Sequence, residues 1–273
     1  MTEVVQSMNC PNCGAPLRLQ AGEIIVTCVY CGTATNLRAD KKFFLAHSLI
    51  PARYSQGDIE RYVREWMGTG FLKPVNLASH SRIESQTLSY LPFFVISLDA
   101  ETKFSGLLKR TGAPERKSDA IKKSYEWKVL ARKSQDFPTS EYDIPLSAKE
   151  TFDLGKIQKE GHFLNAELDE EEAFAMAKGE IENIHRVLAS EYVDDIFEMK
   201  TDFKLNNTEF LHVPVWDVRY NYGNKSYDVL VDGATGKIVR GEFPARKEEE
   251  KSMVLVYIVA AIIILLGLLL LIF

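Results

Sequence analysis

The chain contains four cysteines, and all of them lie near its beginning in two closely spaced pairs. The pairs read CPNCG at 10–14 and CVYCG at 28–32, which gives the pattern C-x2-C-x14-C-x2-C. Two intervening residues let both thiolates of a tight turn reach one metal ion at about 2.3 Å, and the following glycine permits the positive φ that the turn requires. The spacing predicts a metal site with four ligands: Cys10, Cys13, Cys28 and Cys31.

Zinc is the expected ion at this site, and iron is its main competitor for four thiolates. Two disulfide bonds are the other use of four cysteines, but the cytosolic location argued below keeps thiols reduced and favours a metal. Since four protein ligands leave no open position for water or substrate, the ion is expected to be structural. It would fold a domain over residues 1–40 that could not otherwise bury a core.

The segment between the two cysteine pairs must position them. PLRLQAGEIIVTC at 16–28 predicts two short strands around Ala21 and Gly22, the hairpin of a zinc ribbon. Zinc ribbons often contact nucleic acid, which requires clustered lysine and arginine. Residues 1–40 have only two basic side chains against three acidic ones, and the whole chain has a formal net charge of −5. The composition therefore argues against nucleic-acid binding.

Residues 253–273 read MVLVYIVAAIIILLGLLLLIF and contain no charged residue. As a helix this segment rises about 31 Å, which matches the hydrocarbon core of a bilayer. A buried helix is the alternative, but a helix that is apolar on every side would need protein all around it. The sequence predicts one transmembrane helix, preceded by a polar linker at 246–252.

The flanks of this segment predict its orientation. The start, MTEVVQSMN, has neither a basic region nor an apolar stretch, so no secretory signal is expected, and the body should stay in the cytoplasm. Arg246, Lys247 and Lys251 flank the segment on that side, in keeping with the positive-inside tendency. No residue follows Phe273. We therefore expect a single-pass, tail-anchored membrane protein.

Between ribbon and anchor, a short pattern occurs twice. If Pro92 is aligned with Pro214, apolar positions coincide at spacing two: Phe94 with Trp216, Ile96 with Val218, Leu98 with Tyr220, and Ala100 with Tyr222. This is one face of a strand, and each copy follows a polar strand and an amphipathic helix. Ser55 with Asp58, and Asp169 with Glu172, predict the helix starts. The second helix has an apolar face of Ala173, Ala177, Ile181, Ile184 and Leu188.

The predicted fold class is α+β, with a duplicated unit of helix and antiparallel sheet. The expected divisions are a zinc ribbon at 1–40, a first α+β repeat at 41–160, a second at 161–245, the linker at 246–252 and the transmembrane helix at 253–273. The first repeat carries a basic hairpin insertion, with Lys109, Arg110, Arg116, Lys117, Lys122, Lys123, Lys128, Arg132 and Lys133. This insertion is interpreted as a solvated hairpin, with contact to anionic lipid headgroups as the alternative.

The ending VPVWDVRYNYGNKSYDVLVDGATGKIVRGEFP at 213–244 resembles the closing segment of a family of uncharacterised prokaryotic zinc-ribbon membrane proteins with archaeal members. Those proteins open with a CPxCG ribbon and carry an earlier Tyr-x-Pro-[Phe/Trp] strand, which YLPFF at 90–94 matches. The resemblance covers most of residues 10–244. The last strands are also similar to the hairpin of PepSY-like modules. The family has no established activity, so the resemblance implies an architecture and no catalytic residues.

No catalytic motif is present. His47, His80, His162, His185 and His212 form no HxH, HxxxH or HExxH pattern, and there is no P-loop, GxGxxG or GxSxG. ELDEEE at 167–172 has the acidic residues that a helix start favours, and Asp232 is expected to be a turn residue. His212 is interpreted as a strand-end residue. The sequence predicts that the protein is not an enzyme and identifies no small-molecule substrate.

The aromatic face of the second copy has two interpretations. Trp216, Tyr220, Tyr222 and Tyr227 either pack under a helix or form a surface that binds a partner. We expect core packing and predict that Trp216 is buried under the helix at 170–189.

Two functions remain open. The first is a non-enzymatic adaptor or scaffold, held at the membrane for protein–protein interaction; a ribbon that projects from a sealed sheet would favour it. The second is a membrane-held enzyme or regulator that acts on a membrane-associated substrate through the aromatic sheet face. A pocket lined by mutually close Asp, Glu, His or Lys side chains would favour the second.

Overall fold

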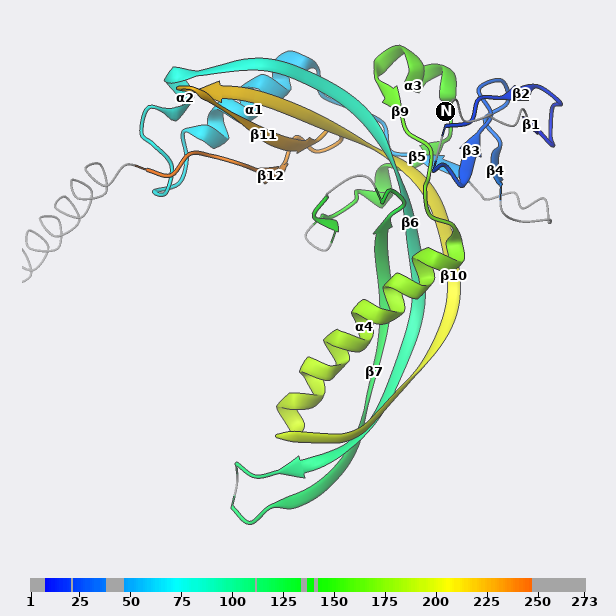
Figure 1. The fold of residues 1–273 in the computed structure, drawn as a ribbon, viewed down its shortest axis with the longest axis vertical. Helices are drawn as coiled ribbons and strands as arrows, with labels where there is room; N and C mark the ends of the chain where they lie inside the picture. The colour runs from blue at the N-terminus through cyan, green and yellow to red at the C-terminus, as the bar shows by residue number, and fades with distance from the viewer. Residues whose placement is uncertain are drawn as a thin grey trace, which may run out of the picture. The chain divides into compact units, whose positions relative to one another are not determined.

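The computed structural model describes residues 8–20, 22–37, 47–110, 112–133, 137–139 and 142–246, which form an α+β protein (Figure 1). The predicted transmembrane segment 253–273 and most of its linker lie outside the described residues. Among the residues that are described, none of the helices has the length and apolar character needed to cross a bilayer.

The described chain forms two compact units, and neither is one continuous stretch of sequence. Unit 1 is built from the residues up to Ala52 and from Leu88–Val215, and unit 2 from Arg53–Thr87 and from Trp216 onward. The compact units thus do not follow the predicted boundaries at 40/41 and 160/161. The physical reason is that two strands, β6 (Ser81–Leu108) and β10 (Asp195–Tyr222), contribute residues to both units.

Both of these strands are longer than predicted. The sequence predicted a polar strand followed by a separate apolar one in each copy, whereas β6 and β10 are each continuous over 28 residues. Pro92 and Pro214 lie inside them and end neither. Proline removes one donor from a strand but keeps its acceptor, and Pro92 O still accepts a hydrogen bond from Ala131 N at 2.9 Å.

The sheet of unit 1 is mixed, which corrects the prediction of an antiparallel sheet. β6 pairs antiparallel with β7 (Glu115–Leu130), from Phe93 opposite Leu130 to Leu108 opposite Glu115, and also pairs with β10. β5 (His47–Leu49) lies parallel to β10, and β9 (His162–Phe163) lies parallel to β6. β8 (Glu150–Thr151) pairs antiparallel with β5. Two further short elements are the 3-10 helix η2 (Leu146–Ala148) and the helix α3 (Leu154–Glu160).

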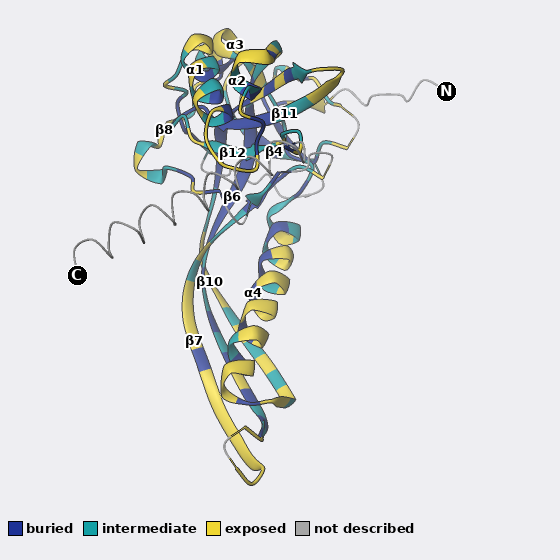
Figure 2. Cartoon of the chain, turned by 90° about the vertical axis from the view of Figure 1, so that its left-hand side faces the viewer, coloured by how far each residue is buried: buried dark blue, intermediate teal, exposed yellow. Residues whose placement is uncertain are grey.

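The helix α4 (Glu170–Tyr192) lies along β6, β7 and β10 (Figure 1). Its buried face carries Ala173, Ala177, Ile181, His185 and Ala189, and the opposite face is exposed along its length (Figure 2). The first three contact Phe94, Ile96, Leu98 and Ala100 of β6 in one core cluster. The predicted face was therefore wrong at Ile184, which is exposed while His185 is buried, and right at Leu188, which packs against a second core cluster.

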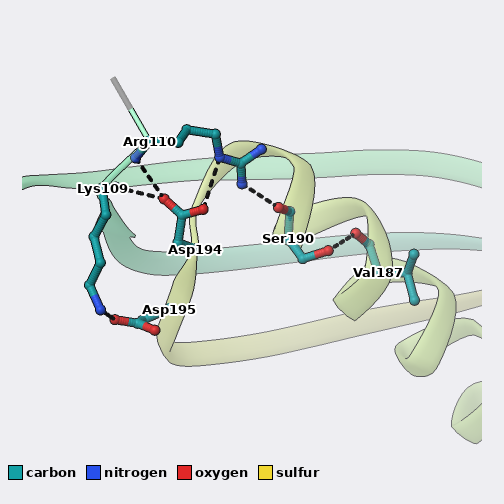
Figure 3. A network of polar contacts seen from close by, with 6 residues as sticks. All are labelled: Lys109, Arg110, Val187, Ser190, Asp194 and Asp195. Atoms are coloured by element: carbon teal, nitrogen blue, oxygen red, sulfur yellow. Dashed lines mark hydrogen bonds and ion pairs between the residues drawn. The ribbon is translucent and has the colours of Figure 1, made fainter. Parts of the chain in front are cut away.

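A network of polar contacts joins the end of α4 to the end of β6 (Figure 3). The Asp194 carboxylate accepts hydrogen bonds from the backbone amides of Lys109 (2.6 Å) and Arg110 (3.2 Å), and from Arg110 Nε (2.9 Å). Arg110 Nη2 also donates to Ser190 O at 2.8 Å, where the C-terminal end of a helix favours a cation. These donors, the Lys109 amide first, hold the pKa of Asp194 below its usual value.

Unit 2 contains α1 (Gln56–Met67), the short α2 (Leu77–His80), β11 (Lys225–Asp232) and β12 (Ile238–Gly241), besides the ends of β6 and β10. The predicted capping box of Ser55 and Asp58 begins α1. β11 and β12 form an antiparallel hairpin, and α1 packs on it. The contact is close: a Cβ on Gly236 would lie 2.6 Å from the Tyr62 ring, and one on Gly241 would overlap the Trp66 ring.

Candidate metal centre

The ribbon holds its four cysteines in two turns of the same geometry. In the first, Gly14 N donates to Cys10 O and Cys10 N to Ala15 O; in the second, Gly32 N donates to Cys28 O and Cys28 N to Thr33 O. Gly14 and Gly32 have φ values of 73° and 74°, the left-handed conformation predicted from the sequence. We call Cys10–Gly14 the first knuckle and Cys28–Gly32 the second knuckle.

The cysteine sulfurs converge on one point. Cys10 Sγ lies 3.6 Å from Cys31 Sγ, Cys13 Sγ lies 3.7 Å from Cys28 Sγ, and all four sulfurs are within 4.8 Å of one another. Metal–sulfur bonds of about 2.3 Å at tetrahedral angles place the sulfurs about 3.8 Å apart. The cluster therefore fits one structural metal ion such as zinc, with Cys10 and Cys28 on the buried side and Cys13 and Cys31 on the exposed side.

The two thiols of the second knuckle differ in acidity, since burial raises the pKa of Cys28 whereas the pKa of Cys31 is lowered. Burial raises the pKa of Cys31, but its hydrogen bonds with the hydroxyl and the backbone amide of Thr33 outweigh burial and lower this pKa to about 6. The Thr33 hydroxyl also accepts a hydrogen bond from Asn12 Nδ2 of the first knuckle at 3.0 Å. Because metal binding displaces protons from thiols, an already acidic Cys31 assists the loading of the site.

The strands of the ribbon pair differently from the predicted hairpin. β1 (Met8–Asn9) pairs with β2 (Pro16–Leu17), and β3 (Ile25–Thr27) pairs with β4 (Ala34–Asn36), both antiparallel. Within the described residues, β2 and β3 are thus not partners of each other. Each knuckle closes its own hairpin, and a metal ion held by all four cysteines would link the two halves in place of cross-strand pairing.

The ribbon is built into the core of unit 1. Ile24 N donates to Ala166 O at 2.7 Å, Ala166 N donates to Ile25 O at 3.2 Å, and Thr27 N donates to Asn165 Oδ1 at 3.0 Å. Ile24, Ile25 and Ala34 belong to the same apolar cluster as the inner faces of β6 and α4. The metal centre therefore supports the core of unit 1 as well as the ribbon.

A groove lies beside the second knuckle. It has a volume of about 540 Å³ and is lined by Val29, Tyr30, Cys31, Gly32 and residues 151–155. Tyr30 is 67% exposed and Val29 is also exposed, although both are large apolar side chains. Gly32 lies against the Phe152 ring, where an added Cβ would be 3.3 Å away. The groove thus joins the metal site to the segment that enters α3.

Beneath the second knuckle lies a histidine pair that the sequence motifs did not reveal. His47 Nε2 and His212 Nδ1 are 2.7 Å apart, and His212 Nε2 donates to Leu164 O at 2.8 Å, so that His47 is the donor within the pair. The His47 ring stacks on Phe152 with centroids 3.6 Å apart. Burial lowers the pKa of His47 to about 3 and that of His212 far below its usual value, so both rings are neutral.

His212 therefore lies fully buried inside β10, which corrects its interpretation as a strand-end residue. Its position in sequence carried one signal of burial: it lies between Leu211 and Val213 in a run of apolar strand residues.

A second buried polar network centres on His185 of α4. His185 Nε2 lies 2.7 Å from the Tyr125 hydroxyl, and His185 Nδ1 lies 2.6 Å from Thr102 Oγ1. Thr102 Oγ1 in turn lies 2.7 Å from Thr201 Oγ1. Burial, with a smaller contribution from Lys123, lowers the pKa of His185. One signal was available in the sequence, because both Thr102 and His185 interrupt apolar stripes of their elements.

The aromatic residues proposed as a partner surface lie in unit 2. Trp216 is 9% exposed and Tyr220 is fully buried, with its hydroxyl donating to Glu242 O at 2.8 Å. Tyr222 and Tyr227 are half-buried, and the Tyr222 hydroxyl donates to Asn76 Oδ1 at 2.7 Å. Burial of Trp216 was expected, but the helix was misassigned: α4 packs in the core of unit 1, and α1 is the long helix of unit 2.

Several charged motifs have structural partners. Asp169 and Glu172 form a capping box at the start of α4, and Asp232 accepts hydrogen bonds from Ala234 N and the Thr235 hydroxyl in the β11–β12 turn. In the basic hairpin of β6 and β7, ion pairs join Lys109, Arg110, Lys122, Lys128, Arg132 and Lys133 to acidic side chains. These pairs favour the solvated-hairpin interpretation.

Comparison with known proteins finds one distant likeness. The chain is 26% identical over 210 residues to the uncharacterized protein YdjG of Bacillus subtilis (strain 168). The aligned part covers 70% of this chain and 62% of that protein, so the chain spans less than two thirds of its relative's length. No protein-family model matches the chain, and neither does any solved structure. The chain is thus distantly similar to YdjG, and it carries an N-terminal four-cysteine cluster that suggests a zinc ribbon.

Proposed function

We propose that this protein is a zinc-ribbon adaptor, held at the membrane by residues 253–273, that binds a protein partner in the cytoplasm and catalyses no reaction. The observation that carries this proposal is the position of the second knuckle. Its inner side is fixed by the metal site and by Phe152, while Val29 and Tyr30 remain exposed beside a groove. Exposed aromatic and aliphatic side chains on a rigid support are the usual anchors of a protein interface.

The expected hallmark of an adaptor, a ribbon that projects away from a sealed sheet, is not what the structure has. One face of the ribbon packs into unit 1 through Ile24 and Ile25. This difference narrows the proposed interface from the whole ribbon to the second knuckle and the groove. The deletion of residues 1–40 would therefore remove part of the core of unit 1 and could not test binding alone.

Point changes on the knuckle test the interface more sharply. In crosslinking and pull-down from native membranes, Val29→Ser combined with Tyr30→Ser should abolish the recovery of proteins captured by the parent chain. Met8→Ser, a change at another exposed apolar residue of the ribbon, is the matched control and should leave recovery unchanged. Equal recovery by all three proteins would show that the second knuckle is not the interface.

Zinc is the ion that we assign to the four cysteines. The sulfur positions and the closed set of four protein ligands support a structural ion, and the choice of zinc over iron follows its preference for tetrahedral thiolates. Metal analysis of the purified protein should find about one zinc per chain. Iron in its place would change the identity of the ion, and the absence of both metals would refute the site.

The membrane attachment has its own test. A chain truncated after Lys251 should leave the membrane fraction and keep its fold, since in the sequence the polar linker at 246–252 separates the apolar segment from the α+β body. If the truncated chain still pellets with membranes at high salt, residues 253–273 are not the main attachment. If it pellets only at low salt, the basic hairpin at 109–133 contacts the headgroups.

A finer family assignment belongs to the same proposal. The likeness to prokaryotic zinc-ribbon membrane proteins, archaeal ones included, is supported by the four-cysteine cluster. Likeness to PepSY-like modules is supported by the β11–β12 hairpin and its Asp232 turn.

One observation favours the enzymatic alternative. A groove of about 460 Å³ on the polar face of β6, β7 and β10 is lined by Asp99, Glu101, Lys122 and Lys204, among others. However, Asp99 accepts hydrogen bonds from Ser124 and Asn206, and Glu101 pairs with Lys122, as is common on the solvated face of a sheet. The adaptor proposal expects Asp99→Asn to leave partner recovery and cellular function unchanged. Loss of cellular function with recovery intact would favour an enzyme or regulator.

A further inference from the structure

The loop between α1 and α2 reverses the usual distribution of polar and apolar side chains. It reads GFLKPV at 70–75, and Phe71 and Val75 are 76% and 75% exposed, with Leu72 also exposed. Lys73, the one charged residue among them, is only 7% exposed. Lysines are almost never buried unless paired, whereas large apolar side chains on loops usually turn inward. The loop therefore presents an apolar tip to its surroundings.

The contacts of Lys73 hold this tip outward. Its Nζ donates to Trp66 O at 2.5 Å and lies 3.6 Å from the centre of the Trp66 ring. Thr69 donates to the same Trp66 carbonyl through its backbone amide and its hydroxyl, and Gly70 has a φ of 93°. Lys73 is fixed inward on the end of α1, whereas Phe71, Leu72 and Val75 before and after it in the loop are exposed. The exposure of the tip is thus a feature of the folded loop.

The chain returns to this loop where its described part ends. Arg246 Nη1 donates to Phe71 O at 3.0 Å, and Arg246 is itself buried, so the segment that follows β12 lies beside the α1–α2 loop (Figure 1). Seven peptide steps lead from Arg246 to Met253, and these span at most about 25 Å when fully extended. The apolar tip is therefore tied close to the start of the segment 253–273.

From this placement we propose that Phe71, Leu72 and Val75 insert into the headgroup region of the bilayer and form a second membrane contact beside the anchor. The inference rests on the membrane span proposed above for 253–273. A span that begins within about 25 Å of Arg246 keeps the loop within reach of the bilayer surface. Aromatic and aliphatic side chains are stabilised at this boundary in proportion to the apolar area that they remove from water.

This second contact would restrict how unit 2 faces the membrane. A single span with a polar linker leaves a domain free to rotate, whereas a contact at two points fixes one surface of unit 2 toward the lipid. A protein partner or a second copy of the chain could also cover the same tip, and the experiment below separates these occupants from lipid.

Tryptophan fluorescence of the full-length chain in phosphatidylcholine vesicles tests the proposal. Three variants each add one tryptophan: Phe71→Trp at the tip, Val187→Trp at an exposed position of α4, and Leu265→Trp in the apolar segment. Val187 is 65% exposed and lies in unit 1, which makes it a matched control for an exposed apolar position. The signal of each added tryptophan is the difference from the parent chain, which contains Trp66, Trp127 and Trp216.

Lipids with brominated chains quench a tryptophan that touches them. We expect the added signal of Phe71→Trp to shift to shorter wavelength and to be quenched most by bromine placed near the headgroup. The signal of Leu265→Trp should be quenched most by bromine deep in the chain, and that of Val187→Trp should not be quenched.

Each contrary result has a distinct meaning. If Leu265→Trp is quenched but Phe71→Trp is not, the anchor stands and the second contact is refuted, with a protein as the remaining occupant of the tip. If neither is quenched, the proposed span itself fails. If Val187→Trp is quenched as strongly as Phe71→Trp, the contact is not specific to the loop and the proposal is overturned.

Discussion

The two units use the same strand pattern for cores of different chemistry. In unit 1, the stripe from Phe94 to Ala100 packs under α4, and the surrounding core also takes in the ribbon. In unit 2, the stripe from Trp216 to Tyr222 lies in a unit whose long helix is α1. Among the described residues, the four cysteines and the buried histidines all belong to unit 1. An apolar stripe thus determines that a strand is buried, while the polar groups placed around it determine how the core responds to metal and acid.

The largest expected difference between the units is in their response to metal loss. Cys28→Ser removes a buried ligand, and structural zinc contributes an apparent binding free energy on the order of 10 kcal/mol to folding. Because Ile24, Ile25 and Ala34 pack in the core of unit 1, we expect hydrogen exchange to accelerate in α4 as well as in the ribbon. The β11–β12 hairpin of unit 2 should keep its protection. Unchanged protection in α4 would show that the ribbon and the core of unit 1 are energetically separate.

A matched pair of truncations compares the two stripes directly. Phe94→Ala and Trp216→Ala each remove a buried aromatic ring from an equivalent strand position, and each should cost about 3 to 5 kcal/mol. Phe94→Ala should reduce hydrogen-exchange protection in unit 1, and Trp216→Ala in unit 2. A thermal midpoint within about two degrees of the parent for Trp216→Ala would show that this residue is not core. In that case the aromatic surface of Trp216, Tyr220, Tyr222 and Tyr227 would return as a candidate interface.

Two glycines should respond with opposite signs to the same substitution. A Cβ on Gly241 of β12 would overlap the Trp66 ring, so Gly241→Ala should destabilise unit 2 by about 1 to 3 kcal/mol. Gly179 lies in α4 with open space around it, so Gly179→Ala should stabilise unit 1 by about 1 kcal/mol through helix propensity. Denaturant melts of the two variants measure both effects. If Gly241→Ala leaves the free energy of unfolding unchanged, α1 does not pack on the hairpin as closely as the structure indicates.

The smallest expected effect is the dependence of the stability of unit 1 on the protonation of His185. Burial lowers the pKa of His185 in the folded protein, while the unfolded chain keeps the ordinary value near 6.5. The unfolded state therefore binds the proton first, so stability is complete above pH 6.5 and declines as the pH falls below it. His185→Gln should remove part of this decline.

The control for the acid response is His80→Gln, which changes an exposed histidine of unit 2. Comparison of each variant with the parent over the same pH range cancels the acid sensitivity of the metal site, which all three proteins share. Curves of stability against pH that run parallel for His185→Gln and the parent would contradict a neutral buried His185.

Local features were predictable from the sequence. The cysteine positions, the positive φ of Gly14 and Gly32, both capping boxes and the buried stripes all depend on residues a few positions apart. The spacing of the cysteines was sufficient for the metal ligands because a turn of fixed geometry brings the two thiols of each pair together.

Features that depend on distant partners were not predictable. Amphipathic spacing shows that a helix buries one face but not which strand it covers, and so α4 was assigned to the stripe at Trp216 instead of the one at Phe94. The pair of His47 and His212 joins residues 165 positions apart, and no local pattern connects them. A polar strand and a separate apolar strand were predicted in each copy, although one strand can continue through a proline wherever the missing donor is not needed.

Because each unit consists of two separate sequence segments, the parts of one unit leave the ribosome at different times. Helix α1 ends at Met67, but the hairpin on which it packs begins only at Lys225. At about 5 to 20 residues per second, a growing chain would carry an unpartnered α1 on the order of ten seconds or more before its sheet exists. The last residue of unit 1 is Val215, so unit 1 can fold before unit 2 is fully synthesised. Its second segment, Leu88–Val215, lies between the two sequence segments of unit 2. Slower translation between residues 67 and 225 would lengthen the exposure of Ile59, Val63 and Met67, the apolar face of α1, and with it the opportunity for chaperones to bind there.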